Sequence, residues 1–101
     1  MKWKPVGWTR LSKEEIKAFK ALYRHREMDR HRIIAMWRNG KGTWMGVGFA
    51  PHPVFTSHRF GTYGVFKIEN GRYSFIITMG KRNQAMNRAC KEMTRHSNQM
   101  L

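Results

Sequence analysis

The densest cluster of chemically active side chains is the segment RHREMDRHR, residues 24–32. Its nine residues include four arginines and two histidines, with only Glu27 and Asp29 to balance them. On a helix, side chains three or four residues apart are neighbours, so part of this charge can pair internally. The surplus arginines have planar guanidinium groups that suit phosphate oxygens. The segment therefore predicts a cationic surface that faces phosphates or carboxylates.

A second basic site lies at GKRNQ, residues 80–84, where a predicted strand passes into a predicted helix. Basic side chains in a first helical turn are unfavourable, because the helix dipole already places positive charge there. Their presence favours a bound anion, which the free backbone N–H groups would also contact. The two sites, with one further arginine along the predicted helix, give the candidate nucleic-acid-binding residues Arg24, Arg26, Arg30, Arg32, Lys81, Arg82 and Arg88.

Residues suited to catalysis or metal binding are sparse. The five histidines have no metal-site spacing on a helix, and six carboxylates are few for a metal-dependent nuclease. RNA cleavage without a metal needs only a base, an acid and cations, which His58, Arg59 and His96 could supply. We nevertheless assign no catalytic residue, and we expect neither a metal site nor a cofactor.

Composition restricts the class of partner. Twenty Lys and Arg against six Asp and Glu give a formal net charge of +14 over 101 residues, which points to nucleic acid, an acidic protein or a ribonucleoprotein. The chain has 13% aromatic residues, too many for a disordered basic tail. Cys90 is the single cysteine, so no internal disulfide forms. The chain has no apolar run long enough to span a membrane, and we expect a cytoplasmic protein.

The pattern of apolar residues predicts one domain, residues 1–101, that begins with helical structure. Ser12 and Glu15 form a capping box, so a helix begins at Ser12. The apolar spacing lapses over residues 24–32 and resumes from Ile33 to Trp37. Either one helix spans residues 12–38, or two shorter helices meet near residues 28–29.

The remaining elements are strands and a final helix. Residues 43–49 read as a strand, residues 62–80 as a hairpin that turns at Asn70-Gly71, and residues 82–97 as a helix. This order predicts an α+β fold, α(continuous or split)-β-β-β-α, with a three-stranded antiparallel sheet and the helices packed on one face. Tyr63 and Tyr73 would stack on nucleic-acid bases if the other face were open.

The segment NGRYSFIITMGKRNQAMNRAC, together with this element order, resembles the double-stranded RNA-binding domain. In that family a K-K-x-A-K pattern opens the last helix and its lysines contact phosphates across a major groove. Here the pattern falls on RNQAM, where Arg82 keeps one basic position, Ala85 keeps the small residue, and Asn83 and Met86 replace the other two lysines. The family's G-P-x-H loop resembles APHP, residues 50–53. The resemblance implies binding to duplex RNA.

The strand end FIITMGKR, after a predicted helical pair, resembles the RelE-like ribosome-dependent endoribonucleases. Only Arg82 carries over to that family's basic positions. We rank three functions on these grounds. The first is phosphate-directed nucleic-acid binding, with RNA favoured over DNA. The second is a small basic inhibitor or accessory protein, of the kind that mobile genetic elements encode, docked on an acidic host protein or nucleoprotein. The third is a metal-free RelE-like endoribonuclease.

Overall fold

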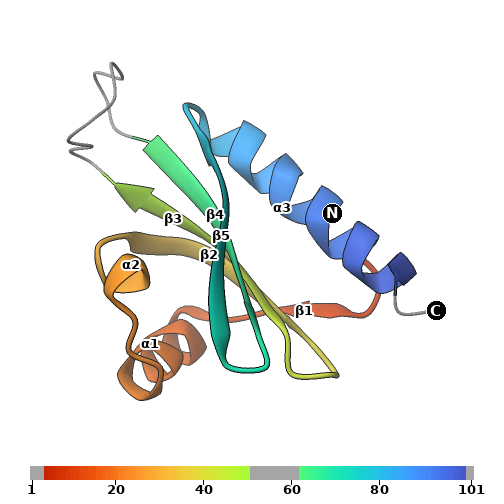
Figure 1. Ribbon diagram of the computed structural model, residues 1–101, viewed down its shortest axis with the longest axis horizontal. Coiled ribbons are helices and arrows are strands. Elements are labelled where there is room, and N and C mark those ends of the chain that lie inside the picture. The colour runs from red at the N-terminus through yellow and green to blue at the C-terminus, as the bar shows by residue number, and fades with distance from the viewer. Residues whose placement is uncertain (1–3, 51–61, 100–101) are drawn as a thin grey trace.

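The computed structural model describes residues 4–50 and 62–99, which form a mixed fold of strands and helices (Figure 1). The α+β class predicted from the sequence is confirmed. The elements in chain order are β1 (Trp8–Arg10), α1 (Lys13–Leu22), α2 (Arg26–Asp29), β2 (Arg32–Asn39), β3 (Trp44–Ala50), β4 (Thr62–Glu69), β5 (Arg72–Met79) and α3 (Arg82–Gln99).

The strands form one antiparallel sheet of five strands in the order β1-β2-β3-β4-β5. Each strand pairs with its neighbour in sequence, so the sheet is a simple meander. The prediction of a three-stranded sheet is wrong because it lacks β1 and β2. β1 has only three residues, which is too short for a strand pattern to be visible.

β2 lies where the sequence predicts the second half of a helix. Ile33, Ile34, Met36 and Trp37 have helical spacing, but in the structure they divide between the two faces of the sheet. A β-bulge between Ile33 and Ala35 shifts the alternation by one residue, and the shifted pattern imitates that of a helix. The helix that begins after Ser12 ends at Leu22, and α2 is a separate helix of four residues. Both versions of the predicted helix over residues 12–38 are therefore wrong beyond residue 22.

Helices cover both faces of the sheet. α3 packs across β3, β4 and β5 on one face, and α1 and α2 lie over the other (Figure 1). The buried core on the α3 side consists of Trp8, Ala35, Trp37, Met45, Val47, Val65, Ala85, Met86, Ala89 and Met93. The buried core on the α1 side consists of Leu11, Met28, Met36, Phe66 and Ile68.

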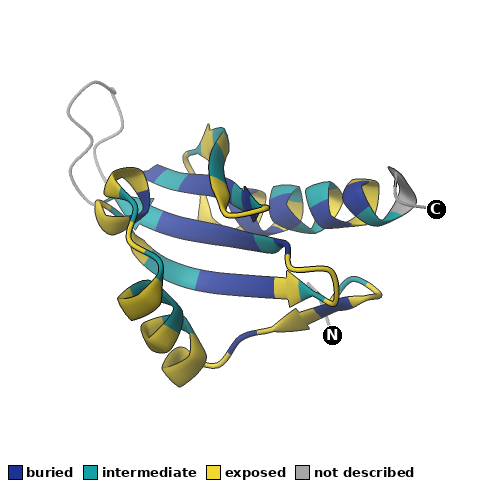
Figure 2. Ribbon diagram, turned by 60° about the horizontal axis from the view of Figure 1, so that its bottom comes forward, coloured by how far each residue is buried: buried dark blue, intermediate teal, exposed yellow. Residues whose placement is uncertain are grey.

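The prediction that all helices pack on one face is therefore wrong. β3 and β4 carry apolar residues at successive positions, so both of their faces need cover (Figure 2). β4 accordingly buries Val65 on the α3 side and Phe66 and Ile68 on the α1 side, whereas Phe75 of β5 is 51% exposed.

Three local predictions are confirmed. The side chain of Ser12 accepts a hydrogen bond from the backbone N–H of Glu15, and Glu15 accepts one from the backbone N–H of Ser12, so the capping box forms. β4 and β5 join through Asn70-Gly71, both with positive φ. α3 buries the small and sulfur-containing face that the sequence predicts.

Glycines let rings lie close to the sheet beneath α2. A Cβ on Gly46 would overlap the ring of Phe66, and a Cβ on Gly48 would lie 2.7 Å from Cβ of His31. A Cβ on Gly64 would lie 3.0 Å from the ring of Phe75. These positions on neighbouring strands therefore favour glycine for close packing.

Candidate nucleic-acid interface

A hollow of about 570 Å³ lies between α1, the start of β2 and the start of α3. We name this hollow the cationic groove. Five of its lining residues are cations, and none is a carboxylate. The cations are Lys13, Lys17, Lys20, Arg32 and Arg82, and the other lining residues are Ile16, Ile33 and Ile34. Like charges gathered around one hollow create a field that attracts anions.

α1 supplies one wall of the cationic groove. Lys13, Lys17 and Lys20 are spaced by four and three residues, so they lie on the same side of the helix. The capping box fixes where this helix begins, and its hydrogen bonds from Ser12 lower the pKa of Glu15. Glu14 and Glu15 complement the dipole in the first turn and do not line the groove.

β2 supplies the opposite side of the groove. β1 pairs with β2 only through residues Trp37–Asn39, so the half of β2 from Arg32 to Ala35 has no second strand among the described residues. We name this half the free edge. Arg32, Ile33 and Ile34 of the free edge line the groove. Backbone groups that have no strand partner within residues 4–50 and 62–99 therefore border a row of cations and isoleucines.

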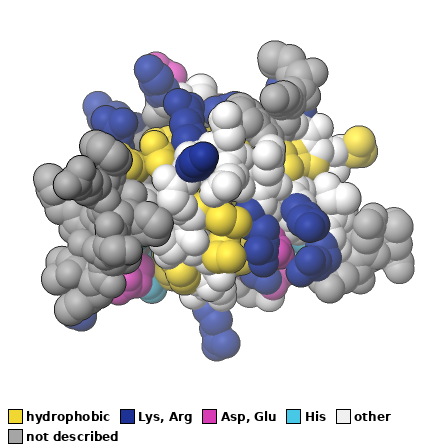
Figure 3. Space-filling model, turned by 90° about the horizontal axis from the view of Figure 1, so that it is seen from above, with side chains coloured by type: hydrophobic (Ala, Val, Ile, Leu, Met, Phe, Trp, Pro, Cys, Tyr) yellow, Lys and Arg dark blue, Asp and Glu magenta, His cyan; other side chains and the backbone are white. Residues whose placement is uncertain are grey.

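α3 begins at the groove. Arg82 is its first residue, and no acidic side chain occupies its first turn. Lys81 is exposed immediately before Arg82 but does not line the groove. Figure 3 views the molecule from the top of Figure 1, and there Lys and Arg side chains are far more numerous than Asp and Glu and flank apolar areas.

Arg24 extends the positive surface beyond the groove. It lines an adjoining hollow with Lys17, Lys20 and Asp29. Its guanidinium Nε lies 3.4 Å from Asp29 Oδ2, and both side chains are solvent-accessible. Such exposed pairs are weak and give way readily to another anion.

The other predicted residues lie apart from the groove. Arg30 on α2 pairs with Glu27 at 3.7 Å, and Arg26 is exposed on the same short helix. Arg88 lies midway along α3, where its Nε donates to Glu92 Oε1 at 2.9 Å. The structure thus brings Arg32 and Arg82 into one groove, places Arg24 and Lys81 beside it, and disperses Arg26, Arg30 and Arg88.

Sequence reasoning missed the lysines of α1. Their four-and-three spacing within SKEEIKAFK was a readable signal for a charged helix face. The sequence instead predicts a site in the arginine-rich segment, residues 24–32, although much of this segment has a local structural role. His25 accepts the backbone N–H of Glu27 and caps α2, and His31 Nδ1 lies 2.8 Å from the carbonyl oxygen of Glu27.

The two tyrosines proposed for base stacking are packed within the protein. Tyr73 stacks between His25 and Phe66, with ring centroids 4.3 and 5.3 Å away. Burial raises the pKa of Tyr73 to about 12, with Glu27 and Tyr23 adding to the shift. Tyr63 is half-buried against Phe49. The tyrosine rings are therefore engaged with other side chains of the fold.

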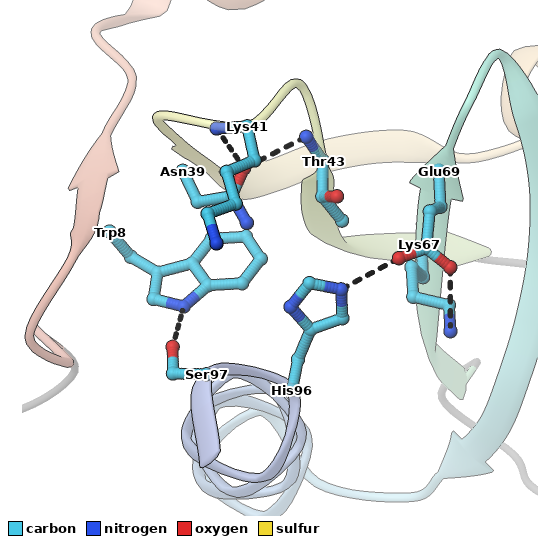
Figure 4. Close-up of polar contacts among 8 residues, drawn as sticks. All are labelled: Trp8, Asn39, Lys41, Thr43, Lys67, Glu69, His96 and Ser97. Atoms are coloured by element: carbon cyan, nitrogen blue, oxygen red, sulfur yellow. Dashed lines mark hydrogen bonds and ion pairs between the residues drawn. The ribbon is translucent and has the colours of Figure 1, made fainter. Parts of the chain in front are cut away.

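His96 is buried and does not line the groove, and Figure 4 shows its imidazole directed from α3 toward Glu69. Its Nε2 lies 2.7 Å from Glu69 Oε2, and this hydrogen bond lowers the pKa of Glu69. Trp8 packs edge-on against the imidazole and donates through Nε1 to Ser97 Oγ. His58 and Arg59, together with residues 51–53 of the APHP loop, lie outside the described residues.

Comparisons with protein-family models, with curated proteins and with solved structures find no match to this chain. No helix among the described residues is long and apolar enough to cross a lipid bilayer. In the same residues no three His, Cys, Asp or Glu side chains gather in a way that could hold a metal ion. A function is therefore inferred from the geometry of the candidate site, of which the cationic groove is the best-defined feature.

Proposed function

We propose that this chain is a nucleic-acid-binding protein that favours RNA over DNA and contacts mainly phosphates. The observation that supports the proposal is the cationic groove, where α1, β2 and α3 contribute five cations and no carboxylate. Ordinary surface charge is mixed in sign, so such a one-signed lining favours a polyanionic ligand. Arg24 and Lys81 border the groove and would add contacts at its margins.

RNA is the preferred nucleic acid because both family resemblances in the sequence are to proteins that act on RNA. The guanidinium groups of Arg32 and Arg82 can each bind two oxygens of one phosphate, whereas the lysines act as point charges. Contacts of this kind position the backbone without reading bases. Binding should therefore depend strongly on salt and only weakly on sequence.

The first experiment is a fluorescence-anisotropy titration of single-stranded RNA, duplex RNA and duplex DNA with the nuclease-treated protein. Titrations at two salt concentrations give the salt slope for each ligand. Lys17→Ala, Arg32→Ala and Arg82→Ala should each lower the affinity for all sequences alike. Each should also reduce the salt slope by about one ion.

The matched control is Lys41→Ala, which removes an exposed cation from the β2–β3 turn, away from the groove. This variant should bind like the wild type. Equal losses in Lys41→Ala and Lys17→Ala would contradict a role for the groove.

Two other outcomes would point to the other functions. Binding that vanishes for every ligand near physiological salt, with retention of a defined acidic protein from a nuclease-treated lysate, would replace the proposal with an accessory or inhibitor role. Shortening of the labelled RNA on a denaturing gel, abolished by His58→Ala or by His96→Ala in protein whose thermal denaturation shows that it is folded, would indicate an endoribonuclease.

A further inference from the structure

We propose that the cationic groove takes a short unpaired stretch of RNA in preference to a duplex. This inference rests on the proposed function and specifies which form of RNA the groove accepts. Three features of the groove carry it: its size, its apolar floor and the free edge of β2.

The size of the groove suits a few nucleotides. Its volume of about 570 Å³ falls within the range of sites for small molecules, about 300–1,000 Å³. Lys13 to Lys20 cover seven helical steps, which is about 10 Å along the wall. Arg32 and Arg82 extend the positive lining to β2 and α3. A duplex is too broad for a hollow of this volume and would touch only its rim.

The floor of the groove suits exposed bases. Ile16, Ile33 and Ile34 lie among the cations, and phosphate gains nothing from contact with isoleucine. In a duplex the faces of the bases are hidden within the stack, so only the charged backbone would meet the groove. An unpaired base has an apolar face that can cover the isoleucines while its phosphates meet the cations.

The free edge of β2 adds hydrogen-bonding groups to the same place. Backbone groups of residues 32–35 that point away from β3 have no strand partner among the described residues. Such groups need partners from water or a ligand. The Watson–Crick edges of unpaired bases carry donors and acceptors that can meet them, whereas a duplex has these edges occupied.

The test compares ligands of equal length on the unaltered protein. The ligands are oligouridine of about eight nucleotides, an abasic strand with the same phosphates, and a duplex of that length. At a fixed salt concentration, oligouridine should bind at least about fivefold more tightly than either of the others, because only it offers base faces to the isoleucines.

Two serine substitutions on α1 locate the effect. Ile16→Ser removes part of the apolar floor, whereas Leu22→Ser removes an apolar side chain that is 88% exposed and does not line the groove. Ile16→Ser should weaken oligouridine binding about fivefold and leave binding of the abasic strand unchanged. Leu22→Ser should bind all ligands like the wild type. Thermal denaturation checks that Ile16→Ser still folds. The comparison of the three ligands uses the unaltered protein and does not depend on this variant.

The outcomes separate the two proposals. Equal binding of oligouridine and abasic strand, or tighter binding of the duplex, overturns the single-strand inference but leaves phosphate-directed RNA binding intact. Displacement of oligouridine by an oligoglutamate peptide at equal concentration would assign the groove to an acidic peptide strand. Loss of all nucleic-acid binding at moderate salt would overturn the proposed function as well.

Discussion

Glu69 and His96 form the contact that ties the end of β4 to α3, and the pKa of Glu69 depends on this contact. The hydrogen bond between Nε2 of His96 and Oε2 of Glu69 is 2.7 Å long. This bond is the main reason for the lowered pKa of Glu69, with Lys67 contributing further. A carboxyl group whose pKa is lower in the folded state stabilises the fold above its unfolded pKa. That stabilisation is lost as the pH falls through the folded pKa.

The variant Glu69→Gln tests this contribution. At neutral pH the variant should melt a few degrees below the wild type, because the amide keeps only a neutral hydrogen bond. The difference should shrink as the pH falls below the ordinary pKa of glutamate and should vanish once Glu69 is protonated. Thermal denaturation from about pH 7 to about pH 3 measures it. Glu14→Gln, on the exposed side of α1, is the control, and a pH-independent difference for Glu69→Gln would contradict the account.

At the level of residues, the sequence pointed to part of the site. The excess of arginine in residues 24–32 predicts Arg32, and helix-end electrostatics predict Arg82; both line the groove. The rest of the arginine-rich segment could not be judged from sequence, because its pairing with Glu27 and Asp29 depends on the turn that α2 makes. Which cations remain available for a ligand is decided by such pairings, and these are tertiary features.

At the scale of elements, α1 is the least firmly held part of the groove. It has ten residues, none of them buried, and it touches the core through half-buried Ile16 and Phe19 (Figure 2). Isolated helices of this length are marginal in water, so α1 depends on its capping box and these few contacts. Because α1 buries little surface, its local unfolding costs little free energy.

Hydrogen exchange measures this directly. Backbone amides of α1 should exchange faster than those of β4, and oligouridine should slow the exchange in α1 because phosphates bind its lysines. The middle of α3, which buries Ala89 and Met93, serves as the internal control and should change little. Protection of α1 equal to that of β4 in the free protein would contradict this picture of the wall.

The sequence predicted the elements that have strong local signals. The start of α1, the Asn70-Gly71 hairpin and α3 each carry a cap, a turn pair or a regular apolar face. β2 was not predicted because its bulge interrupts the strand alternation, so that the apolar residues from Ile33 to Trp37 have helix-like spacing. The helices on both faces of the sheet were not predicted, because their positions follow from long-range packing. The only local signal for them is the succession of apolar residues in β3 and in the middle of β4.

The whole molecule carries a large unbalanced charge. With 20 Lys and Arg against six Asp and Glu, the folded chain repels itself at low ionic strength. Four of the carboxylates, those of Glu27, Asp29, Glu69 and Glu92, already take part in ion pairs. The remaining positive charge has few internal partners, so it is relieved mainly by salt or by a bound polyanion.

Raising sodium chloride from about 20 mM to about 200 mM should therefore raise the melting temperature by several degrees. The variant Lys17→Glu should show a smaller rise than Lys41→Glu, because it removes repulsion inside the groove while changing net charge equally. Differential scanning fluorimetry on the three proteins makes the comparison. A melting temperature that falls with salt would contradict dominant self-repulsion.

The free edge of β2 also affects how copies of the protein meet one another. An unpaired strand edge is a template for adding a strand from a second molecule, which is the usual start of aggregation. Here Arg32 and the lysines of α1 surround that edge, so two empty molecules approach with like charges foremost. A bound strand removes this electrostatic barrier but covers the edge itself. The groove thus opposes aggregation in both states: its positive charge repels a second molecule when it is empty, and the bound strand covers the edge of β2 when it is filled.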